Sequence, residues 1–296
     1  MRLLVKARAK INWTLDVLGQ RPDGYHELDM LISSVTLCDQ LEIREAEELS
    51  LLLANNRHSF VPADERNLVI RAAQALRDAM GVRKGAEMRL HKYIPVCAGM
   101  GGGSSDAAAA LMALNRLWDC RLPLEELSRI GLKIGADVPF CLTGGLCRVR
   151  GIGEQVLPRP MGRAIYLITI QPGRGLSTRE VFESLHTDGI RPEDRPDNDA
   201  AEQALAQGYL RELVGAMGNV LEPVSVRKRP RIEEALRDLR DSGALGAQMT
   251  GSGSVVFGIY PNAYRCREAL AVIQAKYPNA RAMHTADSGI EIVEEE

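Results

Sequence analysis

The segment PVCAGMGGGSSDAAAAL, residues 95–111, most constrains how this chain can fold, because it joins a predicted strand to a predicted helix through four glycines. Glycine has no side chain, so its backbone can adopt positive φ angles and its N–H group can approach a ligand closely. Ser104 and Ser105 follow at the predicted helix start, where free N–H groups and the helix dipole favour an anion. The segment therefore predicts a phosphate-binding loop, with a flexible glycine-rich turn as the simpler alternative.

Two common phosphate-binding patterns do not describe this loop. The pattern GxxxxGK[ST] requires Gly followed directly by Lys, and that dipeptide occurs nowhere in the chain. The dinucleotide-binding pattern GxGxxG fails because Ser104 stands three residues after Gly101. If the loop binds phosphate, it belongs to another class of nucleotide-binding protein.

Hydrophobic periodicity predicts a mixed α+β fold around the loop. Alternating and β-branched residues predict strands at 3–18, 28–37, 40–44, 49–53 and 88–93, and helical spacing predicts helices at 67–80, 104–118 and 123–135. The second half begins with an apolar strand at 165–170, continues through a helix-prone region to 241, and ends with strand, GSGS turn, strand, helix and strand. Because prolines and a glycine at 158–162 resemble a linker, we expect domains at 1–157 and 158–296.

Composition excludes several other functions. The net charge of −2 provides no broad positive field, so nucleic acid is not an expected partner. Neither a signal peptide nor an apolar run of the ~18 residues needed to span a membrane is evident, so we expect a cytoplasmic protein. The six cysteines form no CxxC pair and the five histidines no HxxxH pair, so no metal site is predicted.

Three motifs together resemble those of the GHMP kinases, the family of galactokinase, homoserine kinase, mevalonate kinase and phosphomevalonate kinase. The glycine-rich segment is similar to the second family motif, KARAKINWTLDVLGQRPDGYHEL at 6–28 to the first, and MTGSGSVVFG at 249–258 to the third. AKIN, RPDGYHEL, GGGSSDAAAAL and GADVPF resemble most closely the branch that phosphorylates the 2-hydroxyl of 4-diphosphocytidyl-2-C-methyl-D-erythritol in the non-mevalonate isoprenoid precursor pathway. Met100 departs from the pattern, because leucine is usual there.

The resemblance implies a fold and an activity. The fold is a two-domain α+β GHMP kinase architecture, with an N-terminal domain like domain 2 of ribosomal protein S5, a C-terminal ferredoxin-like domain, and the active site between them. The activity is ATP-dependent phosphoryl transfer to a small-molecule alcohol. Two alternatives remain open: a GHMP-type kinase for another small alcohol, and a catalytically silent sensor on the same scaffold.

The reacting groups follow from the same resemblance. Asp137, in GADVPF, matches the carboxylate that accepts or orients the proton of the attacked hydroxyl, although an isolated Asp in such a turn more often has a capping role. Lys10 matches the catalytic lysine, and its place between Ala9 and Ile11 on a half-buried strand favours that role over a surface position. Asn12 shares a strand face with Lys10 and is expected to hydrogen-bond the substrate.

The resemblance also assigns residues to the two ligands. For a cytidine diphosphate alcohol, Tyr25 stacks on the base, His26 hydrogen-bonds it, Phe182 stacks on its other face, and the turn of Thr250, Gly251 and Ser252 completes the substrate side. Asn67 is assigned to adenine. The ATP phosphates are assigned to Pro95, Val96, Cys97, Ala98, Gly99, Met100, Gly101, Gly102, Gly103, Ser104 and Ser105. ATP is expected as its magnesium complex, without a dedicated metal cage in the protein.

Overall fold

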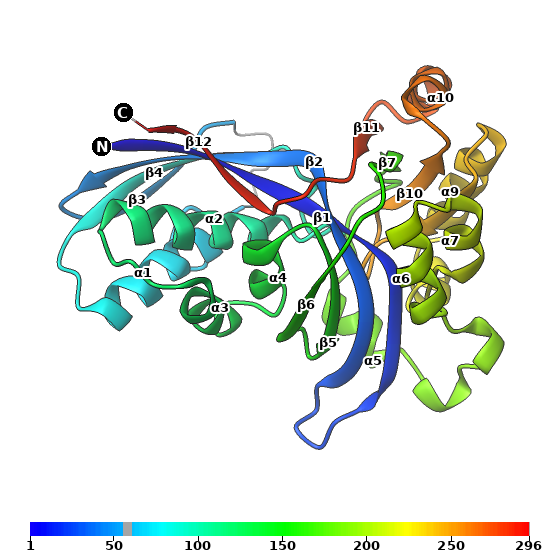
Figure 1. Ribbon diagram of the computed structural model, residues 1–296, viewed down its shortest axis with the longest axis horizontal. Helices are drawn as coiled ribbons and strands as arrows, with labels where there is room; N and C mark the ends of the chain where they lie inside the picture. Colours follow the sequence, from blue (N-terminus) through cyan, green and yellow to red (C-terminus); the bar gives the residue numbers. More distant parts are fainter. Residues whose placement is uncertain (56–60, 296) are drawn as a thin grey trace.

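A long antiparallel hairpin, formed by β1 (Arg2–Gln20) and β2 (His26–Ala46), runs through most of the molecule in the computed structural model, which describes residues 1–55 and 61–295 (Figure 1). Burial alternates along residues 2–9 of β1 and becomes continuous along 9–17. The first part of β1, residues 2–9, therefore packs against a core with one face, whereas residues 9–17 are buried on both faces. The two strands predicted at 28–37 and 40–44 are in fact one strand, because Cys38 and Asp39 remain paired with β1.

Within the described residues, the first sheet has eight strands built around this hairpin. The length of β2 lets it pair with β4 along its second half and with β5 along its first half. Helices cover one face of the sheet (Figure 1). The remaining strands are β3 (Leu49–Leu53), β4 (Gly85–His91), β5 (Leu146–Gly151), β6 (Gln155–Arg159), β8 (Gly218–Asn219) and β12 (Ile290–Glu295), and the helices are α1 (Leu68–Met80), α2 (Gly102–Leu117), α3 (Leu124–Leu132) and α4 (Val138–Thr143).

The second sheet is fully antiparallel, with the strand order β11-β7-β10-β9. In chain order, helices separate β7 from β9 and β10 from β11, which is the ferredoxin-like arrangement predicted for this half of the chain. Its strands are β7 (Tyr166–Ile170), β9 (Gly246–Met249), β10 (Val256–Tyr260) and β11 (Arg281–His284). The accompanying helices are α5 (Thr178–Glu183), α6 (Asn198–Gln207), α7 (Leu210–Ala216), α8 (Glu222–Lys228), α9 (Arg231–Asp241) and α10 (Ala263–Lys276), with short 3-10 turns at Thr187–Gly189 and Pro192–Asp194.

The first sheet contains strands from both predicted domains, so the two domains do not simply follow each other along the chain. β6 crosses the position between residues 157 and 158 where the domain boundary was predicted, and β12 returns to pair with β1 beside the N-terminus (Figure 1). We propose a division in which the second unit begins after β6 and ends before β12. No helix in residues 1–55 or 61–295 has both the length and the apolar character that crossing a bilayer requires.

Candidate active site

The glycine-rich loop leads into the N-terminus of α2, as the sequence predicts. Gly101 precedes the helix with a φ of 69°, and no side chain makes a capping hydrogen bond to the first turn. A Cβ atom at Gly101 would lie 3.0 Å from Cγ of Lys10, so a larger residue would displace that lysine. The first turn of α2 therefore presents uncapped N–H groups and the positive end of the helix dipole to an anion.

Contacts with β1 and with the 250–253 turn hold the loop in place. The backbone N–H of Lys10 donates to the carbonyl oxygen of Met100 at 3.0 Å, and the N–H of Val255 donates to that of Ala98 at 3.2 Å. Gly99 has a φ of 84°, and a Cβ atom there would lie 2.2 Å from the carbonyl oxygen of Thr250. The first and third sequence motifs thus form the two walls between which the second motif is packed.

Lys10, Asn12 and Asp137 meet beside the loop. The Lys10 ammonium, whose side chain is 6% exposed, donates to Oδ1 of Asn12 at 2.7 Å and lies 3.9 Å from Oδ2 of Asp137. Asp137 lies in a turn, as predicted, and immediately precedes α4, which takes the place of a turn at residues 138–140. Its side chain makes no capping hydrogen bond. A carboxylate and a fixed cation are therefore directed at the same place, as proton abstraction from a hydroxyl requires.

The turn at Thr250–Ser252 supports this cluster from the second unit. Thr250 Oγ1 accepts from the Asn12 N–H at 3.0 Å, and the Gly251 N–H donates to Asn12 Oδ1 at 3.1 Å. Ser252 Oγ is hydrogen-bonded to Thr178 Oγ1 of α5 at 2.9 Å. Asn12 consequently joins Lys10 to the third motif, and its carboxamide orientation is fixed by donors on both sides.

The tip of the hairpin carries the predicted base-recognition residues. The ring of His26 lies 5.0 Å from that of Phe182, at an interplanar angle of 40°. These two rings therefore pack against each other, and the Tyr25 side chain is 60% exposed at the tip. Burial lowers the pKa of His26 below its ordinary value of 6.5, so its imidazole is neutral at pH 7.

A single cavity of about 1120 Å³ connects the glycine loop, the Lys10 cluster and the hairpin tip. Pockets for one small molecule usually measure roughly 300–1,000 Å³, so this cavity is slightly larger than that range. The predicted site residues that line it are Lys10, Asn12, Tyr25, His26, Asn67, Pro95, Val96, Cys97, Ala98, Gly99, Gly101, Gly102, Gly103, Ser104, Asp137, Phe182, Gly251 and Ser252.

Three predicted contact residues lie behind the cavity wall. Met100 is part of the hydrophobic core, the Ser105 hydroxyl donates to the Arg8 carbonyl oxygen at 2.6 Å, and Thr250 is fully buried against Asn12. Asn67 lines the cavity but also caps α1, because its Oδ1 accepts from the Val69 N–H at 2.9 Å. The side chains of Met100, Ser105 and Thr250 thus support the wall.

The sequence-based interpretation missed a buried ionic cluster beside the loop. The Lys92 ammonium lies 2.6 Å from Oδ2 of Asp106 on α2 and also contacts Asp39 of β2. Both Lys92 and Asp106 line the cavity, and Oδ1 of Asp106 is buried without a hydrogen-bond partner. Burial, opposed by the charge of Lys92, raises the pKa of Asp106 well above its ordinary value. The only sequence signal was a charged residue at each end of the glycine-rich segment.

Comparison with known proteins agrees with this architecture. The model for the GHMP kinases N terminal domain matches residues 67–145, and that for the GHMP kinases C terminal matches residues 201–279. The chain belongs to the GHMP kinase family and is a small-molecule kinase that uses ATP.

Relatives over nearly the whole chain carry one more specific name. Two proteins named 4-diphosphocytidyl-2-C-methyl-D-erythritol kinase are similar to it: one from Alkaliphilus metalliredigens, 41% identical over 92% of this chain and 93% of its own, and one from Alkaliphilus oremlandii, 38% identical over 98% and 99%. A crystal structure of 4-(cytidine 5'-diphospho)-2C-methyl-D-erythritol kinase superposes with a TM-score of 0.79 at 33% identity, covering 97% and 99%. A homoserine kinase from Cytophaga hutchinsonii, with a TM-score of 0.80 at 18% identity and coverage of 99% and 97%, shares the fold.

Proposed function

We propose that this chain transfers the γ-phosphoryl group of ATP to the 2-hydroxyl of 4-diphosphocytidyl-2-C-methyl-D-erythritol. The observation that carries the proposal is the position of Lys10 and Asp137, which face one cavity between an uncapped helix N-terminus and an aromatic hairpin tip. Relatives of that name, similar over most of the chain, support the choice of alcohol.

In the proposed reaction, Asp137 accepts or orients the proton of the attacked hydroxyl, while Lys10 stabilises the negative charge that develops there. Phosphoryl transfer depends mainly on positioning and charge neutralisation, so the fixed geometry of Lys10 and Asn12 matters as much as their chemistry. The N–H groups at the start of α2 bind the ATP phosphates, and Asn67 lies at the adenine end. Tyr25 stacks on the cytosine base, and the neutral imidazole of His26 hydrogen-bonds its edge.

We further propose that ATP binds as its magnesium complex. Magnesium held by substrate phosphates needs only one or two carboxylates from the protein. Asp106 lines the cavity and has an Oδ1 atom without a hydrogen-bond partner, and a bound cation would favour its ionised form, which burial disfavours. Asp106 would hold the ion, and the ion would neutralise charge on the transferring phosphoryl group. Ser105 does not fit, since its side chain is fully buried and does not line the cavity.

A coupled ADP-release assay with a panel of alcohols tests the proposal. We expect turnover with the cytidylated methylerythritol and little or none with homoserine, mevalonate or galactose. Preference for another alcohol would make the chain a GHMP kinase of different specificity, and ATP binding without any turnover would favour the silent sensor.

A substitution at the hairpin tip tests the site assignment within the same assay. His26→Ala should raise KM for the cytidine substrate about tenfold, the cost of one lost hydrogen bond of about 1.4 kcal/mol, and leave KM for ATP unchanged. His284→Ala, in β11 and outside the cavity lining, is the matched control. An equal rise of both KM values in His26→Ala would contradict the cytidine assignment.

A further inference from the structure

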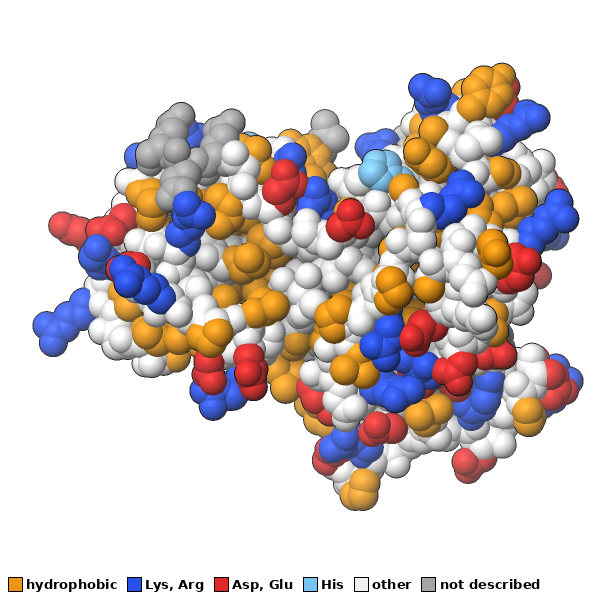
Figure 2. Space-filling view, viewed as in Figure 1, with side chains coloured by type: hydrophobic (Ala, Val, Ile, Leu, Met, Phe, Trp, Pro, Cys, Tyr) orange, Lys and Arg blue, Asp and Glu red, His pale blue; other side chains and the backbone are white. Residues whose placement is uncertain are grey.

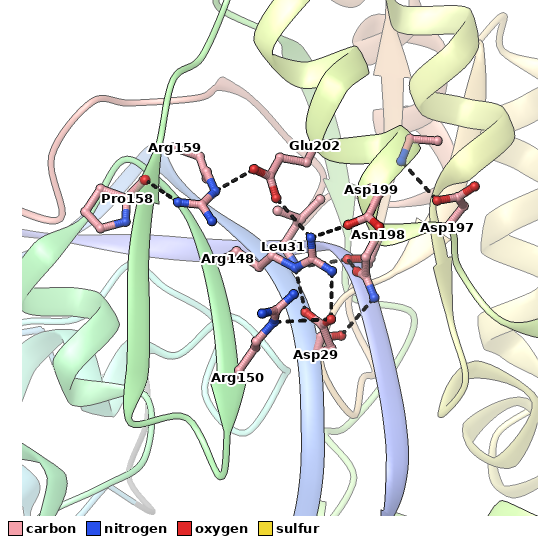
Figure 3. A network of polar contacts seen from close by, with 12 residues as sticks. Asp29, Leu31, Arg148, Arg150, Pro158, Arg159, Asp197, Asn198, Asp199 and Glu202 are labelled. Atoms are coloured by element: carbon pink, nitrogen blue, oxygen red, sulfur yellow. Dashed lines mark hydrogen bonds and ion pairs between the residues drawn. The ribbon is translucent and has the colours of Figure 1, made fainter.

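A network of charged side chains surrounds Asp29 of β2 (Figure 3), whose neighbours Leu28 and Met30 line the cavity. Its centre is the guanidinium of Arg148 on β5, which donates to both carboxylate oxygens of Asp29, from Nε at 2.9 Å and from Nη2 at 2.8 Å. The same guanidinium reaches α6 through Nη1, which contacts Asp199 and lies 3.2 Å from Glu202. One side chain thus connects β2, β5 and α6.

Two further arginines complete the network. Arg150 Nε lies 3.4 Å from Asp29 Oδ2, and Arg159 Nε lies 2.5 Å from Glu202 Oε1. On the face shown in Figure 2, basic and acidic side chains are interspersed over the region of α6 and β5. Burial alone would raise the pKa of Asp29, but its hydrogen bonds to Arg148 and the charge of that guanidinium hold the pKa below its usual value. Asp29 is therefore an ionised carboxylate that depends on Arg148.

The start of α6 holds the other strand of the hairpin as well. Asn198 accepts a hydrogen bond from the Thr14 hydroxyl, which in turn accepts from the Leu31 N–H at 2.8 Å. Just before α6, Arg195 lies 2.5 Å from Asp16 and donates to the Val17 carbonyl oxygen at 3.1 Å. The segment 195–202 is consequently tied to both β1 and β2.

These ties lie at the base of the wall that faces the nucleoside. Leu28 and Met30, the neighbours of Asp29 in β2, line the cavity, because alternate side chains of a strand point to opposite faces. His26 begins the same strand, and its partner Phe182 lies in α5, in the segment that leads to α6. The wall therefore combines two parts of the chain, 24–30 and 178–185, that are far apart in sequence.

We propose that Arg148 is a positioning residue for the proposed kinase reaction: by fastening the hairpin to α6, it sets the spacing of His26 and Phe182 at the cytidine end of the site. The proposal rests on the function proposed above. The planar guanidinium of Arg148 makes two hydrogen bonds to Asp29 and contacts α6 at the same time. Lysine at position 148 would keep the charge but could not make all of these contacts together.

Steady-state kinetics of Arg148→Lys test this role. We expect KM for the cytidylated methylerythritol to rise about tenfold, with KM for ATP within about twofold and kcat within about threefold of the unsubstituted chain. Arg44→Lys is the matched control, because Arg44 forms an exposed ion pair with Glu87 at the end of β2 far from Asp29. A purely structural role would lower the active fraction and leave both KM values unchanged; that result, or an equal rise in both, would overturn the proposal.

Hydrogen exchange provides a readout that does not need the substrate. Amides in 20–30 and 178–186 should exchange faster in Arg148→Lys, while those in 95–110 keep their rates; unchanged rates in the first two segments would overturn the proposal. If the unsubstituted chain does not phosphorylate the cytidine substrate, the proposed function fails and hydrogen exchange still decides on the positioning role. If Arg148→Lys does not fold, Asp199→Asn is the substitute, because it removes the ion pair between Arg148 and α6 by changing a side chain that is 86% exposed. We expect the same pattern, with KM for the cytidine substrate raised about threefold.

Discussion

Asn12 connects the proposed reacting groups of the site. Its Oδ1 accepts from the Lys10 ammonium at 2.7 Å and from the Gly251 N–H at 3.1 Å, and its backbone N–H donates to Thr250. A lysine held in this way loses rotamer freedom before the substrate arrives, so its charge is already in place during the reaction. In the proposed reaction, Asn12 would thereby act through Lys10 in addition to any direct contact with the substrate.

The proposed role of Asp137 predicts that one substitution separates ATP binding from turnover. Asp137→Asn keeps the size of the side chain but removes the base, so kcat should fall at least ~100-fold while the Kd for ATP stays within about twofold. Stopped assays for kcat and calorimetry for Kd measure the two quantities. Asp119→Asn, an exposed turn residue paired with Arg121, is the control. Near-normal turnover in Asp137→Asn would remove Asp137 from the proposed role.

The lowered pKa of His26 predicts a pH dependence on the nucleoside side. Neutral imidazole can both donate and accept a hydrogen bond, whereas the protonated ring only donates. KM for the cytidine substrate should be flat above pH 6.5 and rise by up to about tenfold per pH unit once the pH falls below the His26 pKa, which lies under 6.5. His26→Gln keeps a donor and an acceptor that do not titrate, so the rise should disappear. A rise that persists in His26→Gln would locate the titrating group elsewhere.

The sequence predicted site residues that belong to recognisable motifs, but not site residues that only the fold brings together. Lys10 and Asn12 share a strand face, which the period of two predicts, and the structure confirms their contact. The cluster of Lys92, Asp39 and Asp106 joins three elements, and no spacing in the sequence indicates that these residues meet.

The backbone of the glycine loop is packed tightly against the turn at Thr250–Ser252, and this packing holds the loop in its conformation. Gly99→Ala combines a positive φ with a Cβ atom 2.2 Å from the Thr250 carbonyl oxygen. Besides about 1 kcal/mol of backbone strain, the clash should separate the two turns and raise KM for ATP by about tenfold or more. Gly243→Ala has a φ of +94° with nothing within 4 Å, so it should lower stability by a similar strain without altering either KM. Similar KM values in both variants would show that close packing of the loop is unimportant.

Predictions for elements succeeded where the periodic signal is long. The helices predicted at 67–80 and 104–118 correspond to α1 and α2, within a few residues at each end. The turn predicted for GADVPF was right only in its first half: residues 136–137 form a turn in which the Val138 N–H donates to the Gly135 carbonyl oxygen at 3.1 Å, but residues 138–143 form the short helix α4. Six residues contain fewer than two helical turns, too few to show a period, and proline near a helix start supports the helix that it appeared to interrupt.

The whole molecule is held together by the long hairpin. β1 contributes Leu3 and Val5 to one hydrophobic cluster and Ile11 and Trp13 to the other, and each cluster also contains residues of the second sheet. The sequence suggested two consecutive domains because prolines near 158–162 resemble a linker. Periodicity could not reveal that β12 returns to β1, since strand pairing between distant segments leaves no local pattern.

The two tryptophans belong to different hydrophobic clusters, and they predict how the chain unfolds. Trp13 packs edge-on against Phe257 of β10 at 5.7 Å, whereas Trp118 follows α2 and donates to the Gly85 carbonyl oxygen at 3.3 Å. Because β1 takes part in both clusters, the variants Trp13→Phe and Trp118→Phe should each unfold in urea with a fluorescence midpoint that coincides with that of their own circular dichroism. If the fluorescence midpoint of either variant differs from its circular dichroism midpoint, the two units unfold separately, as consecutive independent domains would.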